Sequence, residues 1–193
     1  AVPAGRALAA PGSGSRPTID LVFALDTTGS MSDEIALVRR LVWDLANGVI
    51  SGTPRPSIRL GLVRFRDRGD RYVVKHDPLT FDLDAIHNRL MKTRANGGGD
   101  APEHEHLGLH TSLNQKWRAS ARKLVFLIGD ARPKRYGEHP PARETARARR
   151  LGVTVHALGC SGLDPAGVKA FTAIASGTGG SYIPLPRGST RDR

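Results

Sequence analysis

Three oxygen-bearing side chains recur at every second position directly after a largely apolar segment. Asp26, Thr28 and Ser30 follow residues 19–25, which are rich in β-formers. Oxygen atoms at this spacing, in a loop that leaves a strand, can all point at one cation. Because carboxylate and hydroxyl oxygens are hard ligands, the stretch predicts a site for Mg²⁺, Mn²⁺ or Ca²⁺.

Helix capping is a simpler interpretation of the two hydroxyls. Thr28 or Ser30 could accept a hydrogen bond from the backbone at the start of the next helix. Capping accounts for one hydroxyl, but it does not account for Asp26, which stands where the strand ends. We therefore keep both interpretations, a metal site and a helix cap, for these residues.

Further acids follow other strand-like segments or lie in the loops between them. They are Asp67, Asp100, Glu103 and Asp130. In a doubly wound sheet, ligands bind outside the carboxyl ends of the strands, so we expect these acids to gather at one edge. Carboxylates repel one another strongly in a crevice of low dielectric constant. Bound cations are the simplest compensation.

Periodicity predicts the elements that must position these side chains. Apolar runs rich in β-formers indicate buried strands, and apolar residues three or four positions apart indicate helices. We expect strands over residues 19–25, 58–65, 71–75, 123–129, 153–159 and 180–185, and helices over residues 32–47, 82–90, 102–113, 141–151 and 165–176.

The alternation of strand and helix predicts an α/β fold. We expect a doubly wound, Rossmann-like three-layer sandwich with a mostly parallel six-stranded sheet. The turn at residues 66–70 is so short that the strand after it must be antiparallel and lie at an edge. Gly48 is expected to end the first long helix.

The 193-residue chain is long enough for one domain, which we place at residues 18–186, with tails at residues 1–17 and 187–193. A net charge of +11 favours anionic partners, such as acidic proteins, nucleic acid, phospholipid or acidic glycans, although arginine used for solubility would give the same charge. Only 5% of residues are aromatic and no nucleic-acid-binding motif occurs, so nucleic acid is not the expected partner.

No apolar run is long enough for a membrane span. The single Cys160 does not fix the compartment.

With these loops in place, the chain resembles the von Willebrand factor A domain, also called the integrin I domain, over about residues 18–185. Residues 26–30 (DTTGS) match the D-x-[ST]-x-S motif of its metal-ion-dependent adhesion site, and residues 126–131 (FLIGDA) match the strand and acid of its third metal loop. Residues 97–103 (GGGDAPE) differ from the common middle loop and are more similar to the I-like domain of integrin β chains.

The resemblance implies a divalent-metal site that captures a Glu or Asp carboxylate of a protein partner. Its implied metal ligands are Asp26, Thr28, Ser30, Asp130, Glu103, Asp100 and Asp67, the last two forming a neighbouring calcium site with the Pro102 carbonyl. For Asp67, pairing with Arg66 or Arg68 is an equal alternative. Asp33 and Glu34 match a third site, but we prefer their interpretation as helix N-terminal charges.

Integrin-type domains have a last helix that moves when the site is occupied. The prolines and polar residues after residue 183 leave no room for that helix, so either the helix is absent or the chain is a fragment, and we do not expect the same switch.

Other constellations remain open. His106 and His110 lie one helical turn apart and could hold zinc, although a solvated helix face is the preferred interpretation, and His156 is expected to be a core histidine. Arginines in residues 132–150 form either a patch for an acidic partner or a solvated helix face. The alternatives to a binding module are a metal-dependent hydrolase and a basic domain that binds anionic polymers without metal.

Overall fold

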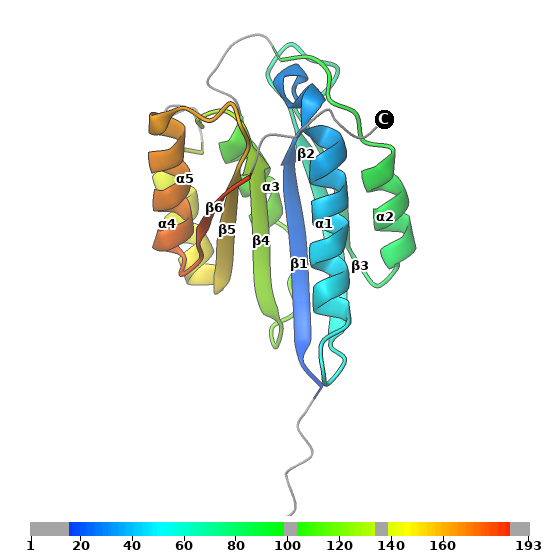
Figure 1. Ribbon diagram of the computed structural model, residues 1–193. Helices are drawn as coiled ribbons and strands as arrows, with labels where there is room; N and C mark the ends of the chain where they lie inside the picture. The colour runs from blue at the N-terminus through cyan, green and yellow to red at the C-terminus, as the bar shows by residue number, and fades with distance from the viewer. Residues whose placement is uncertain (1–15, 99–103, 134–138, 186–193) are drawn as a thin grey trace, which may run out of the picture.

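A computed structural model describes residues 16–98, 104–133 and 139–185. Its centre is a six-stranded sheet in the order β3-β2-β1-β4-β5-β6, and it confirms the predicted doubly wound α/β fold (Figure 1). The strands are β1 (Thr18–Asp26), β2 (Ser57–Phe65), β3 (Val74–Thr80), β4 (Arg122–Gly129), β5 (Val153–Gly159) and β6 (Tyr182–Pro184). β3 runs antiparallel to β2, and all other paired strands are parallel.

The helices form a layer on each face of the sheet (Figure 1). They are the short 3-10 helix η1 (Gly29–Asp33), α1 (Ile35–Ile50), α2 (Leu83–Met91), α3 (Glu105–Leu113), α4 (Pro141–Leu151) and α5 (Pro165–Gly177). α1 and α2 pack with one set of β1 side chains, and α3, α4 and α5 pack with the alternate set. Successive strand residues point to opposite faces, so β1 is buried on both sides.

Two predicted boundaries are wrong, each for a physical reason. The antiparallel strand covers Val74–Thr80 rather than residues 71–75. It is a polar edge strand that contains Pro78, so it lacks the apolar run by which buried strands are found. Gly48 does not end the first helix, which continues to Ile50 because Val49 and Ile50 pack against the core.

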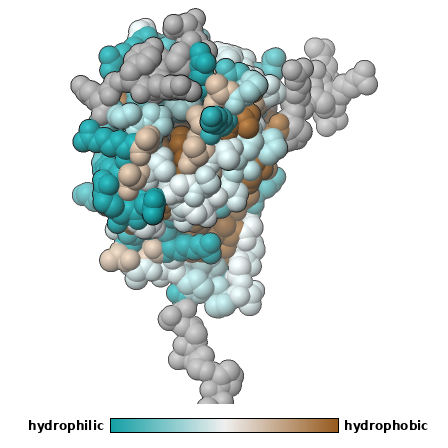
Figure 2. Space-filling model, turned by 90° about the vertical axis from the view of Figure 1, so that its left-hand side faces the viewer, coloured by the Kyte–Doolittle hydropathy of each residue, from teal (hydrophilic) through white to brown (hydrophobic). Residues whose placement is uncertain are grey.

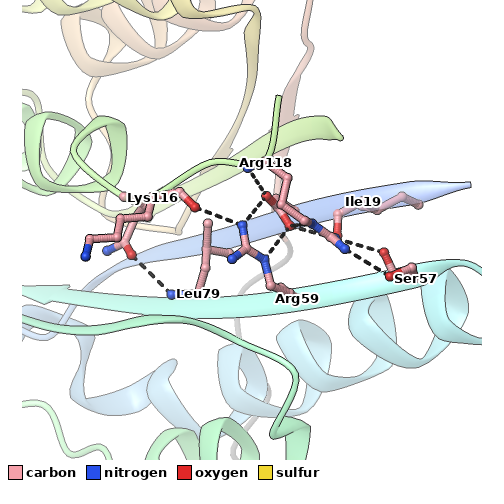
Figure 3. Close-up of polar contacts among 8 residues, drawn as sticks. Ile19, Ser57, Arg59, Leu79, Lys116 and Arg118 are labelled. Carbon is pink, nitrogen blue, oxygen red and sulfur yellow. Dashed lines mark hydrogen bonds and ion pairs between the residues drawn. The ribbon is translucent and has the colours of Figure 1, made fainter. Parts of the chain in front are cut away.

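A buried carboxylate joins the strands at the end of the sheet opposite their carboxyl termini. Asp20, on β1, is fully buried and accepts hydrogen bonds from Arg59 and from both the backbone and the side chain of Arg118, at 2.7–3.0 Å. Arg118 also donates to the carbonyls of Ile19 and Ser57, at 2.7 and 2.9 Å (Figure 3). These contacts hold β1, β2 and the segment before β4 in register.

The face that carries α4 and α5 combines hydrophilic side chains with apolar surface (Figure 2). An apolar groove between the two helices is lined mainly by Pro141, Ala142, Ala170, Ala173 and Ile174. Arg143, Arg149 and Arg150 of α4 are exposed, whereas Lys134, Arg135 and Glu138 lie outside the described residues.

The strand order places a topological switch point between β1 and β4. From β1 the chain continues to β2 on one side, and from β4 it continues to β5 on the other side. In such folds the crevice beyond the carboxyl ends of the switching strands is the usual ligand site. Asp26 and Asp130 stand at those two ends. None of the described helices is long and apolar enough to cross a membrane.

Candidate metal centre

Asp26, Thr28 and Ser30 form a linked group at the end of β1. The backbone N–H and the hydroxyl of Thr28 both donate to Oδ1 of Asp26, at 2.8 and 2.7 Å. Oγ1 of Thr28 lies 3.1 Å from Oγ of Ser30. Thr28 precedes η1 but its side chain makes no capping hydrogen bond, so capping is the wrong interpretation of this hydroxyl.

Two buried carboxylate oxygens in this group have no hydrogen-bond partner within the described part of the chain. They are Oδ2 of Asp26, whose side chain is fully buried, and Oδ1 of Asp130, whose exposed fraction is 7%. A buried polar atom without a partner is costly, and in native proteins it commonly marks a place for a water or an ion.

Burial raises the pKa of both acids. For Asp26, burial and the nearby charge of Asp130 outweigh the hydrogen bonds from Thr28, and the pKa rises to about 7. For Asp130, burial and the charge of Glu34 raise the pKa against the hydrogen bond from Ser30. The two carboxylates therefore lie close enough to repel each other, and among the described residues neither forms an ion pair.

Glu34 brings a third buried carboxylate to the same edge. It stands at the N-terminus of α1, where the sequence places it, and its carboxylate accepts hydrogen bonds from the backbone N–H of Ser161, at 3.0 and 3.2 Å. It thereby holds the loop after β5. Asp33 is exposed to solvent.

The first segment after β2 contributes a second set of polar contacts. Asp67 is buried, and its carboxylate contacts the imidazole of His104. Arg66 donates to Oγ1 of Thr27 at 3.3 Å and to the carbonyl of Arg94 at 2.9 Å. Among the described residues, the recorded contact of the Asp67 carboxylate is therefore with His104, and none with an adjacent arginine is recorded.

The middle loop begins directly beside the Asp26 group. The N–H of Asn96 donates to the Thr27 carbonyl at 3.0 Å, and the N–H of Gly29 donates to the Gly97 carbonyl at 2.8 Å. The N–H of Gly98 donates to the carboxylate of Asp70, at 2.9 and 3.1 Å. The predicted ligands Asp100 and Glu103, with the Pro102 carbonyl, lie outside the described residues.

Gly97 lies where this loop contacts Asp70. Its φ of +78° is in the left-handed region, and a Cβ there would overlap the Asp70 carboxylate. We expect Gly97→Ala to lower the free energy of unfolding by about 2 kcal/mol, from backbone strain and the displaced hydrogen bonds.

Gly69→Ala is the matched control for this prediction. Gly69 has a φ of +97°, but a Cβ there would meet no atom within 4 Å. Strain alone then costs about 1 kcal/mol. Urea denaturation of both variants measures the difference, and equal losses would contradict the role assigned to the Asp70 contact.

Several residues at this edge could not be found by motif. Asp70 and His104 pair with segments distant in sequence, and the only signal for Asp70 was its place beside a turn glycine.

Cys160 is buried, and burial together with the charge of Glu34 raises the pKa of its thiol, which does not suit a nucleophile. His156 stacks on Phe126 at 5.2 Å and accepts a hydrogen bond from the Ser181 N–H, so its ring has partners, but it is partly buried rather than a core residue as expected.

His106 and His110 do not form the zinc pair that was considered, and the preferred interpretation as a solvated helix face is wrong for His106. His106 is buried beside His104, with ring centroids 5.2 Å apart. His110 instead lies against His139 and Glu144. The two histidines thus belong to different surroundings.

The group around Asp26 combines carboxylate and hydroxyl oxygens, two of them with unused hydrogen-bonding capacity. This donor set suits a hard divalent cation such as Mg²⁺, Mn²⁺ or Ca²⁺. Such an ion would offset the mutual repulsion of the buried carboxylates.

A family model described as the von Willebrand factor A domain matches residues 20–186. The chain is 32% identical over 181 residues to von Willebrand factor A domain-containing protein 7 of Rattus norvegicus, a match covering 86% of this chain and 19% of that protein. It is 27% identical over 117 residues to alpha-protein kinase vwkA of Dictyostelium discoideum, covering 58% of this chain and 18% of that protein. The chain thus spans about a fifth of the length of these curated relatives.

Solved structures show the same fold. The pilus adhesin SpaC of Lactobacillus rhamnosus GG superposes with a TM-score of 0.71 at 16% identity, covering 91% of this chain and 28% of that chain. An aerotolerance-related membrane protein of Bacteroides fragilis superposes with a TM-score of 0.65 at 16% identity, covering 88% of this chain and 92% of that chain.

Proposed function

This chain belongs to the von Willebrand factor A domain family, which consists mostly of protein-interaction and adhesion modules, and we propose that it binds a protein partner through a divalent metal. In this proposal Asp26, Thr28, Ser30 and Asp130 hold the ion, and an Asp or Glu carboxylate of the partner completes its coordination. The proposal describes a binding module rather than an enzyme.

One observation supports the metal more than any other. Oδ2 of Asp26 and Oδ1 of Asp130 are buried, lack hydrogen-bond partners within the described ranges, and belong to acids that repel each other. A core built for stability alone would pair these oxygens or replace them with apolar groups. A cation gives both oxygens a partner and lowers the repulsion.

The residues around the ion have distinct roles in this proposal. The two hydroxyls contribute neutral oxygens, so the bound Mg²⁺ or Mn²⁺ keeps enough charge to attract an outside carboxylate. The Thr28 N–H fixes Oδ1 of Asp26 and so orients the carboxylate. Asp100, Glu103 and Asp67 remain proposed ligands, and for Asp67 the ion would compete with His104.

The net charge supports an acidic partner. At +11, the chain attracts negatively charged surfaces over a range set by ionic strength. The exposed arginines of α4 can contribute to this attraction. A partner presenting an acidic side chain therefore fits both the ion and the surface around it.

A hydrolase on the same edge is the alternative that this proposal does not adopt. The acids nearest the proposed ion are assigned to holding it, and Glu34 is bound to the Ser161 backbone. The Cys160 thiol is buried and its pKa is raised by burial and by Glu34. The proposal therefore retains no enzymatic step.

Calorimetric titration of Mg²⁺ and Mn²⁺ into the chelator-treated protein tests the metal site. We expect saturable binding that Asp130→Asn weakens at least tenfold, because this change removes a charged ligand. Asp33→Asn is the matched control, since it removes an equal charge from the exposed end of η1. Equal affinity in the two variants, or no binding to the wild type, would overturn the proposal.

A pair of peptides tests the carboxylate of the partner. The peptides differ only in a central Glu or Gln, and the measurement is the water-proton relaxation of the Mn²⁺-loaded protein. The Glu peptide should lower the relaxation enhancement by displacing water from the ion, and the Gln peptide should not. Equal effects of the two peptides would contradict capture of a carboxylate.

A further inference from the structure

Two imidazoles and a carboxylate meet between α3 and α4, on the sheet face opposite α1 and α2. Nδ1 of His110 lies 3.2 Å from Oε1 of Glu144, and Nδ1 of His139 lies 3.5 Å from the same oxygen. The two rings stack with centroids 3.6 Å apart. One ligand atom from each residue lies within 4.8 Å of the others.

We propose that His110, His139 and Glu144 form a zinc-binding site. In a tetrahedral zinc site with bonds of about 2.0–2.1 Å, two neighbouring ligand atoms are about 3.3–3.4 Å apart. The two nitrogen-to-oxygen separations in this cluster lie on either side of that value. Binding of one ion requires the two stacked rings to turn so that a nitrogen of each faces the ion together with the Glu144 oxygen.

Burial strengthens this assignment. Glu144 is 1% exposed in the first turn of α4, so its negative charge must be matched, either by Arg147 as in the metal-free protein or by a cation. The two histidine side chains are about one quarter exposed, at 25% and 24%, which leaves a path for an ion to enter. Three protein ligands leave a fourth tetrahedral position for water or an outside ligand.

Arg147 occupies part of this space in the metal-free arrangement. Its Nη1 lies 3.3 Å from both Oε2 of Glu144 and Nδ1 of His110, and its guanidinium also contacts Asn114. Asn114 in turn lies 3.0 Å from Nε2 of His110. A zinc ion replaces this contact between Arg147 and the cluster, and the arginine, with a side chain 27% exposed, turns toward solvent.

The donor set separates this site from the one at Asp26. Imidazole nitrogens favour zinc and its neighbours in the transition series, whereas hydroxyl and carboxylate oxygens favour Mg²⁺ and Ca²⁺. A zinc ion here joins the last turn of α3 to the residues that lead into α4. The site is therefore independent of the proposed function and survives if that proposal fails.

Competition with a chromophoric chelator, on the untagged full chain, measures zinc affinity. We expect one zinc to bind per chain, His139→Gln to weaken binding at least tenfold, and an excess of Mg²⁺ to leave it unchanged. His139 precedes α4 and is partly exposed, so this variant avoids the buried Glu144. His76→Gln, on the exposed face of β3, is the matched control.

Two further measurements make the outcome decisive. Co²⁺ in place of zinc should give the intense visible absorption of four-coordinate cobalt, which His139→Gln removes. Arg147→Gln should strengthen zinc binding, because it removes the competing cation. Equal affinities in His139→Gln and His76→Gln, or a six-coordinate cobalt spectrum, would overturn the site, while unchanged circular dichroism shows that the variants are folded.

Discussion

Replacing Asp20 with Asn is expected to lower the free energy of unfolding by about 3–5 kcal/mol, the usual loss when one partner of a buried ion pair is removed. Asp20 is fully buried and faces two arginines, both of which donate to it. Asparagine has nearly the same volume but no charge, and its amide group would oppose the donors of Arg59 and Arg118. The arginines would then stay partly buried without their anion.

Acid has a related effect in the wild-type protein. Burial raises the pKa of Asp20, but the hydrogen bonds from Arg59 and Arg118 and the charge of Arg59 together lower it below its ordinary value. The folded state thus binds this proton less readily than the unfolded state. The stabilisation from Asp20 is present above about pH 4 and is lost as the pH falls further.

Urea denaturation at pH 7 and pH 3 measures both effects. Asp44→Asn, on the exposed side of α1, removes the same charge and should change stability by less than about 0.5 kcal/mol. The difference in free energy of unfolding between Asp20→Asn and the wild type should shrink as the pH falls below about 4. A loss no larger than that of Asp44→Asn would show that the buried network does not stabilise the sheet.

The fold was predictable because its central strands are buried on both faces. β1, β4 and β5 appear in the sequence as short apolar runs, and a parallel sheet requires such runs. β3 was misplaced because an edge strand with Pro78 needs no apolar run. The end of α1 was misplaced because packing of Val49 and Ile50 outweighed the local preference of Gly48.

The centre of the candidate metal site was predictable for a similar reason. Asp26, Thr28 and Ser30 are close in sequence, and Asp130 ends the strand beside theirs, so the topology alone brings them to one edge. Contacts between distant segments left no such signal. Glu34 with Ser161 and Asp67 with His104 depend on how loops pack. The histidine spacing even indicated a wrong partner for His110.

The metal-free protein should lose stability as the pH rises, because the pKa of Asp26 is about 7 in the folded state against 3.8 for an ordinary aspartate. Below about pH 4 the carboxyl is protonated in both states. Between about pH 4 and 7 only the unfolded state ionises, so stability falls with rising pH, and above pH 7 the loss is complete. At about 1.4 kcal/mol per pH unit, the total loss in the free energy of unfolding is at most about 4 kcal/mol.

Asp26→Asn should therefore stabilise the metal-free protein at pH 8, by about 2 kcal/mol. Its Oδ1 can still accept both hydrogen bonds from Thr28, and it carries no buried charge. The comparison is made by thermal or urea unfolding in chelator, with Asp33→Asn as the control for charge at the same end of the sheet. A metal-free Asp26→Asn that is less stable than the wild type would mean that the Asp26 charge is already compensated.

Adding Mg²⁺ should reverse this order, because a ligand that binds only the folded state stabilises it in proportion to the logarithm of its concentration. The wild type gains this stabilisation, whereas Asp26→Asn lacks the charge that binds the ion. We expect the wild type to be less stable than Asp26→Asn in chelator and more stable than Asp26→Asn in Mg²⁺. That reversal would show that Asp26 serves ion binding and lowers the stability of the metal-free fold. If the order does not reverse, the buried charge needs an explanation other than a metal.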